Sequence, residues 1–186
     1  MTATFGRVAV LGLGLIGGSL MHAIRQNGLD VVGYDTDPQT AAAASASGFP
    51  VLPTDAAAVR GADLVVLAMP LPQVRDALRS LAPHLAPDAL LTDVGTLKAP
   101  VLAAVRELAP HARFVGGHPL AGTEESGWGA TDPMRFRDAP WTLTLEPETD
   151  LDDWVALAAQ VCALGAKPVP TTAADQAAAV AHVIGL

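Results

Sequence analysis

The sequence has only one cysteine, Cys162, and charged residues make up only 16% of its 186 residues. A single thiol excludes an internal disulfide, and it leaves no partner for a CxxC redox motif or a cysteine-based zinc site. We expect Cys162 to be a buried, unreactive thiol, because its neighbours in a predicted helix are Leu and Ala. A reducing, cytoplasmic environment is the corresponding prediction.

Positive charge is also scarce. The sequence has 11 Lys and Arg residues against 19 Asp and Glu residues, a formal net charge of −8. Only Lys98 and Lys167 are lysines. Binding to nucleic acid or to an anionic membrane requires a basic surface, so we expect neither partner. No spacing of His, Asp and Glu residues predicts a metal site, so no metal is expected.

Long uninterrupted apolar runs are missing, although 51% of the residues are hydrophobic and the mean hydropathy is +0.35. The most apolar stretch, residues 8–24, is interrupted by several glycines and by Ser19 and His22. It therefore falls short of the roughly 20 apolar residues that span a bilayer. Arg7 precedes this stretch, as in a secretory signal, but no small-residue cleavage site follows. We expect neither a membrane segment nor export.

Short β-branched or leucine-rich runs alternate with alanine-rich helical stretches. This alternation predicts a Rossmann-like, doubly wound α/β fold with a mostly parallel sheet. Strands are predicted at residues 7–11, 31–34, 51–52, 64–69, 89–92, 113–115, 141–145 and 167–169. Helices are predicted at residues 16–26, 38–47, 73–81, 99–108, 152–164 and 173–186. The run 64–69 is the most apolar and is expected at the centre of the sheet, whereas the alternating run 141–145 is expected at an edge.

The domain organisation follows from the same pattern. Residues 1–171 are predicted to form a dinucleotide-binding domain, and residues 172–186 to begin a C-terminal helical domain. The last helix carries an apolar stripe at Val180, Val183 and Ile184. Because such a stripe needs a partner, we expect a further domain or a second subunit to cover it.

A glycine-rich motif, Gly12-Leu-Gly14-Leu-Ile-Gly17, follows the first predicted strand and opens the first predicted helix. In this context it predicts a dinucleotide site, with the pyrophosphate bound at the helix N-terminus. Asp35 ends the second strand, where an acidic residue binds the ribose hydroxyls, and no arginine adjoins it. NAD is therefore favoured over NADP. The predicted cofactor-binding residues are Gly12, Gly14, Leu15, Ile16, Gly17, Asp35, Met69, Pro70 and Asp93.

Two further segments carry candidate chemistry. Thr96 places a hydroxyl, and Lys98 a cation, in a loop at the carboxyl end of a predicted strand, where ligands bind in open α/β sheets. His118 lies in the predicted loop 116–122, between glycine and proline, which suits contact with a ligand better than packing in a core. A neutral imidazole can accept a proton from a substrate hydroxyl.

In this order, the segments GLGLIGGS (12–19), DVGTLK (93–98) and GGHPLAGTEESG (116–127) resemble the prephenate/arogenate dehydrogenases of tyrosine biosynthesis. The resemblance implies oxidation and decarboxylation of a cyclohexadienol with NAD(P), and a homodimer formed through an all-helical second domain that begins at the end of this chain. It implies that His118 binds the ring hydroxyl and assists its deprotonation, and that Thr96 replaces a serine. The substrate-binding residues that it implies are Thr96, Lys98, His118, Gly122, Thr123 and Glu124.

Some features depart from the family, and two alternatives stay open. Ala181 precedes His182 where the family has a Ser-His pair, and only Arg135 and Arg137 are nearby candidates to bind substrate carboxylates. The alternatives are another NAD-dependent hydroxyacid or imine reductase, and a non-catalytic NAD-binding fragment. The choice between prephenate and arogenate also stays open.

Overall fold

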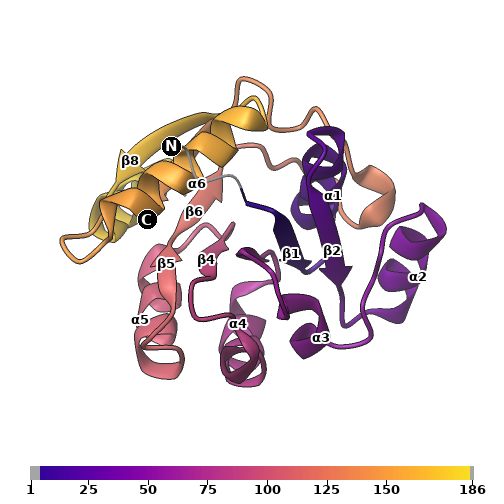
Figure 1. Ribbon diagram of the computed structural model, residues 1–186. Helices are drawn as coiled ribbons and strands as arrows, with labels where there is room; N and C mark the ends of the chain where they lie inside the picture. The colour runs from indigo at the N-terminus through magenta and orange to yellow at the C-terminus, as the bar shows by residue number, and fades with distance from the viewer. Residues whose placement is uncertain (1–4, 185–186) are drawn as a thin grey trace.

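A computed structural model describes residues 5–184, which contain a five-stranded parallel sheet in the order β2-β1-β3-β4-β5 (Figure 1). An isolated parallel bridge between Gly33 and Val51 extends this sheet beyond β2. Counting this bridge as the outermost strand, the order matches the 3-2-1-4-5-6 order of the Rossmann fold, with β3 near the centre as predicted. The doubly wound, mostly parallel α/β fold is therefore confirmed. The strands are β1 Arg7–Leu11, β2 Asp30–Tyr34, β3 Leu64–Leu67, β4 Leu90–Asp93 and β5 Arg113–Val115.

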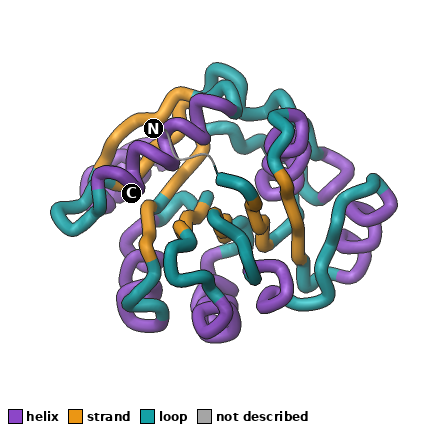
Figure 2. Tube along the Cα trace, viewed as in Figure 1, coloured by secondary structure: helices purple, strands orange, loops and turns teal. Residues whose placement is uncertain are grey.

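Helices connect the strands and cover the sheet (Figure 2). The helices are α1 Leu15–Gln26, α2 Pro38–Ala46, α3 Asp55–Val59, α4 Leu71–Leu81, α5 Lys98–Leu108, α6 Leu151–Ala163 and α7 Ala173–Ile184. Asp37 caps α2 as its sequence predicts, and its carboxylate accepts from the backbone N–H of Thr40 at 2.9 Å. The predicted end of the last helix at Leu186 and the side chains of residues 182–184 lie outside the described residues.

Alternate residues of β1 enter two separate hydrophobic layers. Val8 and Val10 pack with α1 and α6, whereas Ala9 and Leu11 pack with α3, α4 and α5. In Figure 1, these last three helices lie below the sheet. All four of these β1 side chains are completely buried. A strand covered on both faces needs apolar residues at every position, which explains its uniform composition.

A second sheet of three strands carries the segment around His118. Its order is β6-β7-β8, with bounds Gly117–Pro119, Pro140–Thr144 and Lys167–Thr171. The prediction of an edge strand at 141–145 is wrong, because β7 pairs antiparallel with β6 and parallel with β8. The alternation in β7 instead reflects one-sided burial: Trp141 and Leu143 are buried, and Thr142 between them is partly exposed. The predicted loop 116–122 likewise contains a strand.

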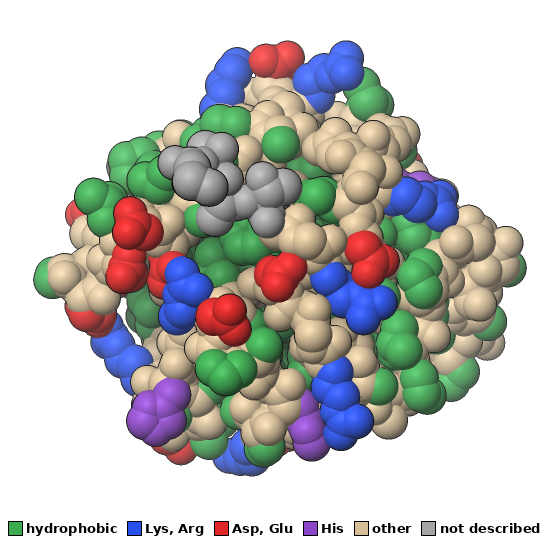
Figure 3. All heavy atoms as spheres, viewed as in Figure 1, with side chains coloured by type: hydrophobic (Ala, Val, Ile, Leu, Met, Phe, Trp, Pro, Cys, Tyr) green, Lys and Arg blue, Asp and Glu red, His purple; other side chains and the backbone are tan. Residues whose placement is uncertain are grey.

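The surface corrects one prediction. Cys162 is exposed rather than buried. Leu157 and Val161 lie on the buried face of α6, and Cys162, the next residue in the helix, lies on the exposed side. Acidic and basic side chains are interspersed on the face shown in Figure 3. Within residues 5–184, no helix is long and apolar enough to cross a membrane, and no group of His, Cys, Asp and Glu is arranged to hold a metal ion.

Candidate nucleotide and catalytic site

The turn between β1 and α1 requires glycine for close packing at two positions. Gly12 has φ +96°, and a Cβ added there would lie 2.7 Å from the carbonyl carbon of Ala68. A Cβ on Gly17 would lie 1.8 Å from the carbonyl oxygen of Gly12. At Gly14, by contrast, a Cβ would meet nothing within 4 Å. The first and third glycines therefore hold the turn and the helix together, whereas the second leaves the backbone open to a ligand.

A cavity of about 850 Å³ lies at the carboxyl ends of the strands and includes Gly12, Gly14, Leu15 and Ile16 in its lining. Gly14 is the N-cap of α1, no side chain caps the helix there, and its first turn has no acidic residue. The uncapped N–H groups and the helix dipole together make such a terminus a binding site for anions. Gly17 lies behind the turn rather than in the cavity lining.

Asp35 lies directly after β2 and lines this cavity. Its carboxylate accepts from the backbone N–H of Leu13 at 2.6 Å and from that of Asp37 at 2.8 Å. These two contacts fix the carboxylate between the glycine turn and the start of α2. Among the described residues, the cavity lining contains no Lys or Arg. Its acidic members are Asp35, Asp37, Asp55, Asp76 and Glu125.

The other predicted cofactor residues divide between two places. Met69 and Pro70 line the large cavity, as well as a smaller neighbouring cavity of about 330 Å³. Asp93 borders only the smaller one, and its side chain is 2% exposed. Its carboxylate therefore lies within the protein core and not on the surface of the nucleotide cavity.

Asp93 forms a buried ion pair with Lys98, whose side chain is 1% exposed. The Lys98 ammonium also donates to the carbonyl oxygen of Gly117 at 2.6 Å, and Asp93 accepts from the N–H of Gly95 at 3.0 Å. Burial lowers the pKa of Lys98 and raises that of Asp93, and the attraction between the two charges opposes both shifts. The sequence predicted the Lys98 cation in a loop where it could contact a ligand. The structure instead buries it, and its bonds to Asp93 and Gly117 link β4 to β6.

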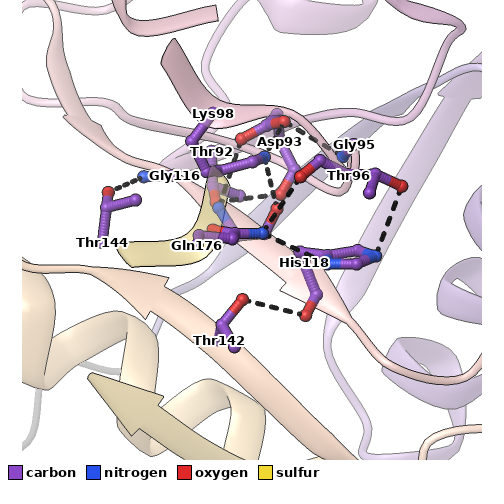
Figure 4. Close-up of polar contacts among 11 residues, drawn as sticks. Thr92, Asp93, Gly95, Thr96, Lys98, Gly116, His118, Thr142, Thr144 and Gln176 are labelled. Atoms are coloured by element: carbon purple, nitrogen blue, oxygen red, sulfur yellow. Dashed lines mark hydrogen bonds and ion pairs between the residues drawn. The ribbon is translucent and has the colours of Figure 1, made fainter. Parts of the chain in front are cut away.

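His118 is half-buried on β6, and its imidazole contacts residues from two other parts of the chain (Figure 4). Its Nε2 atom lies 3.5 Å from the hydroxyl oxygen of Thr96. Its Nδ1 atom lies 3.2 Å from the amide nitrogen of Gln176 on α7. Burial and, to a lesser degree, the charge of Lys98 lower the pKa of His118. Both effects favour the neutral form of the ring at pH 7, and a neutral imidazole can form a hydrogen bond with a hydroxyl.

Gln176 was missed by sequence reasoning. It belongs to an alanine-rich helix and to no recognisable motif, and 58 residues separate it from His118. Only the packing of α7 against α5 brings the amide to the ring. No local signal in the sequence could have identified it.

The segment that follows β6 is exposed, whereas the imidazole of His118 is half-buried. Gly122, Thr123 and Glu124 are exposed, and the large cavity is lined instead by the next residues, 125–127. Arg135, a candidate for binding substrate carboxylates, has a side chain only 8% exposed. Its guanidinium donates to the carbonyl oxygens of Ala130 and Ala121, at 3.0 and 3.3 Å. Arg135 therefore holds this segment in place.

A parallel sheet, a glycine turn that opens α1 and an acidic residue after β2 together define a dinucleotide-binding domain of the Rossmann type. Residues 20–169 match the family model described as "Prephenate dehydrogenase, nucleotide-binding domain", and the chain belongs to this family. The suspected family is thus confirmed.

Individual relatives agree with this assignment. The chain is 36% identical over 149 residues to a prephenate dehydrogenase from Bacillus subtilis, an alignment that covers 77% of this chain and 40% of that protein. It is 35% identical over 149 residues to a cyclohexadienyl dehydrogenase from Zymomonas mobilis, with coverage of 78% and 51%. The structure of Synechocystis arogenate dehydrogenase superposes with a TM-score of 0.88 at 31% identity, covering 95% of this chain and 63% of that one. The chain therefore spans about half the length of the curated relatives it matches, or less.

Proposed function

We propose that the protein acts as an NAD-dependent dehydrogenase that oxidatively decarboxylates prephenate to 4-hydroxyphenylpyruvate, or arogenate to tyrosine. The observation that carries this proposal is the position of the His118 imidazole beside the hydroxyl of Thr96, with Nε2 and the hydroxyl oxygen 3.5 Å apart. Val94 and Gly95 line the large cavity, and Thr96 follows them directly in the chain. The imidazole and the hydroxyl therefore lie next to the proposed nucleotide cavity.

NAD fits the residues of this cavity. The open position at Gly14 and the uncapped backbone N–H groups at the start of α1 suit a pyrophosphate. The carboxylate of Asp35 suits the adenosine ribose hydroxyls. The acidic lining, without Lys or Arg among the described residues, would repel the 2′-phosphate of NADP. When bound, NAD supplies the hydride acceptor.

In the proposed reaction, His118 receives the proton of the substrate hydroxyl at Nε2 as the hydride leaves the alcohol carbon. The Thr96 hydroxyl orients the same oxygen. Loss of carbon dioxide then completes the aromatic ring, and the phenolate oxygen that results takes the proton back from His118. A general base of this kind contributes about 10²- to 10⁴-fold in rate. Gly122, Thr123 and Glu124 are proposed to face the substrate from the exposed segment after β6. Lys98 is proposed to act on the site through its bond to Gly117.

The proposal also covers the domain organisation and the oligomeric state. Residues 1–171 form the proposed nucleotide-binding domain, and residues 172–186 are proposed to begin a helical domain that mediates a homodimer. Because Arg135 is already engaged with backbone carbonyls, it is not proposed to bind the substrate carboxylates.

The test replaces His118 with Asn, which cannot accept a proton at neutral pH. We expect NADH binding to be retained and turnover of prephenate and arogenate to fall by about 10²- to 10⁴-fold. The matched control is His111→Asn, because His111 is exposed at the other end of the sheet, just before β5. Near-normal turnover in the His118 variant would remove this residue from the mechanism and contradict the proposal.

A further inference from the structure

Gln176 reaches His118 from a helical turn that is itself firmly held. The hydroxyl of Thr172 accepts from the backbone N–H of Asp175 at 3.0 Å, and Glu146 accepts from that of Ala173 at 2.6 Å. These contacts cap the first turn of α7, and Gln176 follows in the same turn with only 5% of its surface exposed. A buried amide on an anchored turn has few alternative positions.

The contacts of Gln176 determine which end of its amide faces the ring. Its nitrogen lies 3.2 Å from the carbonyl oxygen of Thr96 and 3.2 Å from Nδ1 of His118. A carbonyl oxygen only accepts hydrogen bonds, so the atom opposite Thr96 must be the donating NH₂ group. The same NH₂ group therefore donates to Nδ1.

A neutral imidazole carries one hydrogen, on one of its two nitrogens. Because Nδ1 accepts from Gln176, the hydrogen of His118 lies on Nε2, which faces the hydroxyl of Thr96. We infer that Gln176 is a positioning residue that selects the tautomer of His118 and thereby controls whether Nε2 can accept a proton.

The chemical consequence rests on the proposed function. A ring with its hydrogen on Nε2 can donate to a substrate hydroxyl but cannot take up its proton there. To act as a base, Nε2 must lose this hydrogen while Nδ1 gains one, and Nδ1–H then needs an acceptor. The Oε1 atom of Gln176 is buried and has no hydrogen-bond partner among the described residues. A half-turn of the amide would bring this oxygen to Nδ1.

The half-turn has a cost that favours the observed arrangement. It would place Oε1 opposite the carbonyl oxygen of Thr96, where two acceptors repel each other. Glutamine thus offers one end of its amide to each tautomer of His118. In the observed arrangement the ring is held with Nε2 as a donor, and the base form arises only when the amide turns.

The charged groups near the ring come from other elements. Lys98 on α5 is the charge that acts on His118, and it is paired with Asp93 at the end of β4. From β7, the neutral hydroxyl of Thr142 donates to the carbonyl oxygen of His118 at 3.4 Å. Gln176 from α7 is neutral as well. Changes at Gln176 therefore alter the hydrogen bonding of the ring without altering the Lys98–Asp93 pair.

The test measures the ring nitrogens directly, by ¹⁵N NMR of histidine-labelled protein over a range of pH, with His118→Asn to assign the signals. In the unchanged protein we expect the hydrogen of neutral His118 on Nε2. Gln176→Met removes the donor to Nδ1, so the pKa of His118 should rise by about 0.5 to 1, equivalent to one neutral hydrogen bond. Gln176→Glu presents only acceptors, so the hydrogen should move to Nδ1 and the pKa should rise further.

Gln160→Met is the matched control, because Gln160 is also a buried glutamine in a helix but lies on α6. It should leave both the tautomer and the pKa of His118 unchanged. A hydrogen on Nδ1 in the unchanged protein would overturn the inference. So would a tautomer and pKa that are the same in both Gln176 variants as in the unchanged protein. Methionine is uncharged and close in size to glutamine. The Gln176→Met variant therefore still tests the inference if the buried glutamate of Gln176→Glu prevents folding.

The kinetic measurement separates this inference from the proposed function. If His118 is the proton acceptor, the acidic limb of kcat/KM should move upward with the NMR pKa in both Gln176 variants. NMR changes without any movement of this limb would support the role of Gln176 and contradict the role of His118 as base. Unchanged NMR signals together with normal turnover would contradict the role of Gln176 alone.

Discussion

The ammonium group of Lys98 donates a 2.6 Å hydrogen bond to the carbonyl oxygen of Gly117, the residue that immediately precedes His118. The same ammonium pairs with Asp93, which also accepts from the N–H of Gly117 at 3.2 Å. Both polar groups of the Gly117 backbone are thus bound to one buried ion pair. This arrangement links the end of β4 to the strand that carries the imidazole.

Removing the cation should therefore destabilise the protein. Lys98→Met leaves the carboxylate of Asp93 buried without its partner, and we expect a loss of about 3–5 kcal/mol in the free energy of unfolding. Urea denaturation measures this loss. Lys167→Met is the control, because the Lys167–Asp138 pair is exposed, at 66% and 77% of its side-chain surfaces, and should matter little. Equal effects of the two substitutions would show that the buried pair contributes no more than a surface pair.

Substitutions at two glycines of the turn between β1 and α1 should separate an effect on stability from an effect on cofactor binding. A Cβ added at Gly14 would meet nothing within 4 Å, so Gly14→Val should cost much less stability than Gly17→Ala while weakening NADH binding by at least about tenfold. Gly17→Ala adds a Cβ only 1.8 Å from the carbonyl oxygen of Gly12, so it should lower the thermal midpoint strongly. Thermal unfolding and NADH titration of the two variants measure both effects. Tight NADH binding by Gly14→Val would place the pyrophosphate elsewhere.

The acidic residue after β2 should determine the choice of cofactor. Asp35→Ser combined with Thr36→Arg removes a carboxylate and adds a cation in the lining of the cavity. We expect NADPH affinity to increase relative to NADH affinity, because an arginine near this position can accommodate the 2′-phosphate. Competitive titration of the two reduced cofactors measures the ratio. Asp30→Ser is the control, since Asp30 pairs with Arg7 at the opposite end of β2. An unchanged ratio would mean that the ribose is bound by other residues.

Local patterns predicted the parts of the molecule that depend on neighbouring residues. The glycine spacing at 12–17 predicted the turn and the start of α1, because Gly12 and Gly17 each meet a steric requirement, with the residue after β3 and within the turn respectively. The apolar run of β3 predicted its central place, because both faces are covered by helices. Asp35 was predicted from its distance along the chain, which a strand and a helix of standard length determine.

Other features depend on contacts between segments distant in the sequence, which no local pattern contains. The central position of β7 depends on pairing with β8, more than 20 residues later. The burial of Lys98 depends on Gly117, and the position of Gln176 depends on the packing of α7 against α5. The exposure of Cys162 depends on which face of α6 meets the sheet, and its alanine-rich sequence marks that face weakly.

Protonation of His118 should affect the pH dependence of both the activity and the stability of the protein. Burial and, to a lesser degree, the charge of Lys98 lower the pKa of His118, so kcat/KM should keep its plateau to a lower pH than an imidazole with the ordinary pKa of about 6.5 would allow. The unfolded chain binds this proton at higher pH than the folded one. The stability linked to His118 is therefore fully present above pH 6.5 and is lost as the pH falls through the folded pKa. His118→Asn should flatten the dependence of unfolding free energy on pH in this range, although His22, whose pKa is also lowered by burial, maintains part of it. Urea denaturation of both proteins between pH 5 and pH 8 measures the difference, and identical slopes would show that His118 titrates alike in the folded and unfolded states.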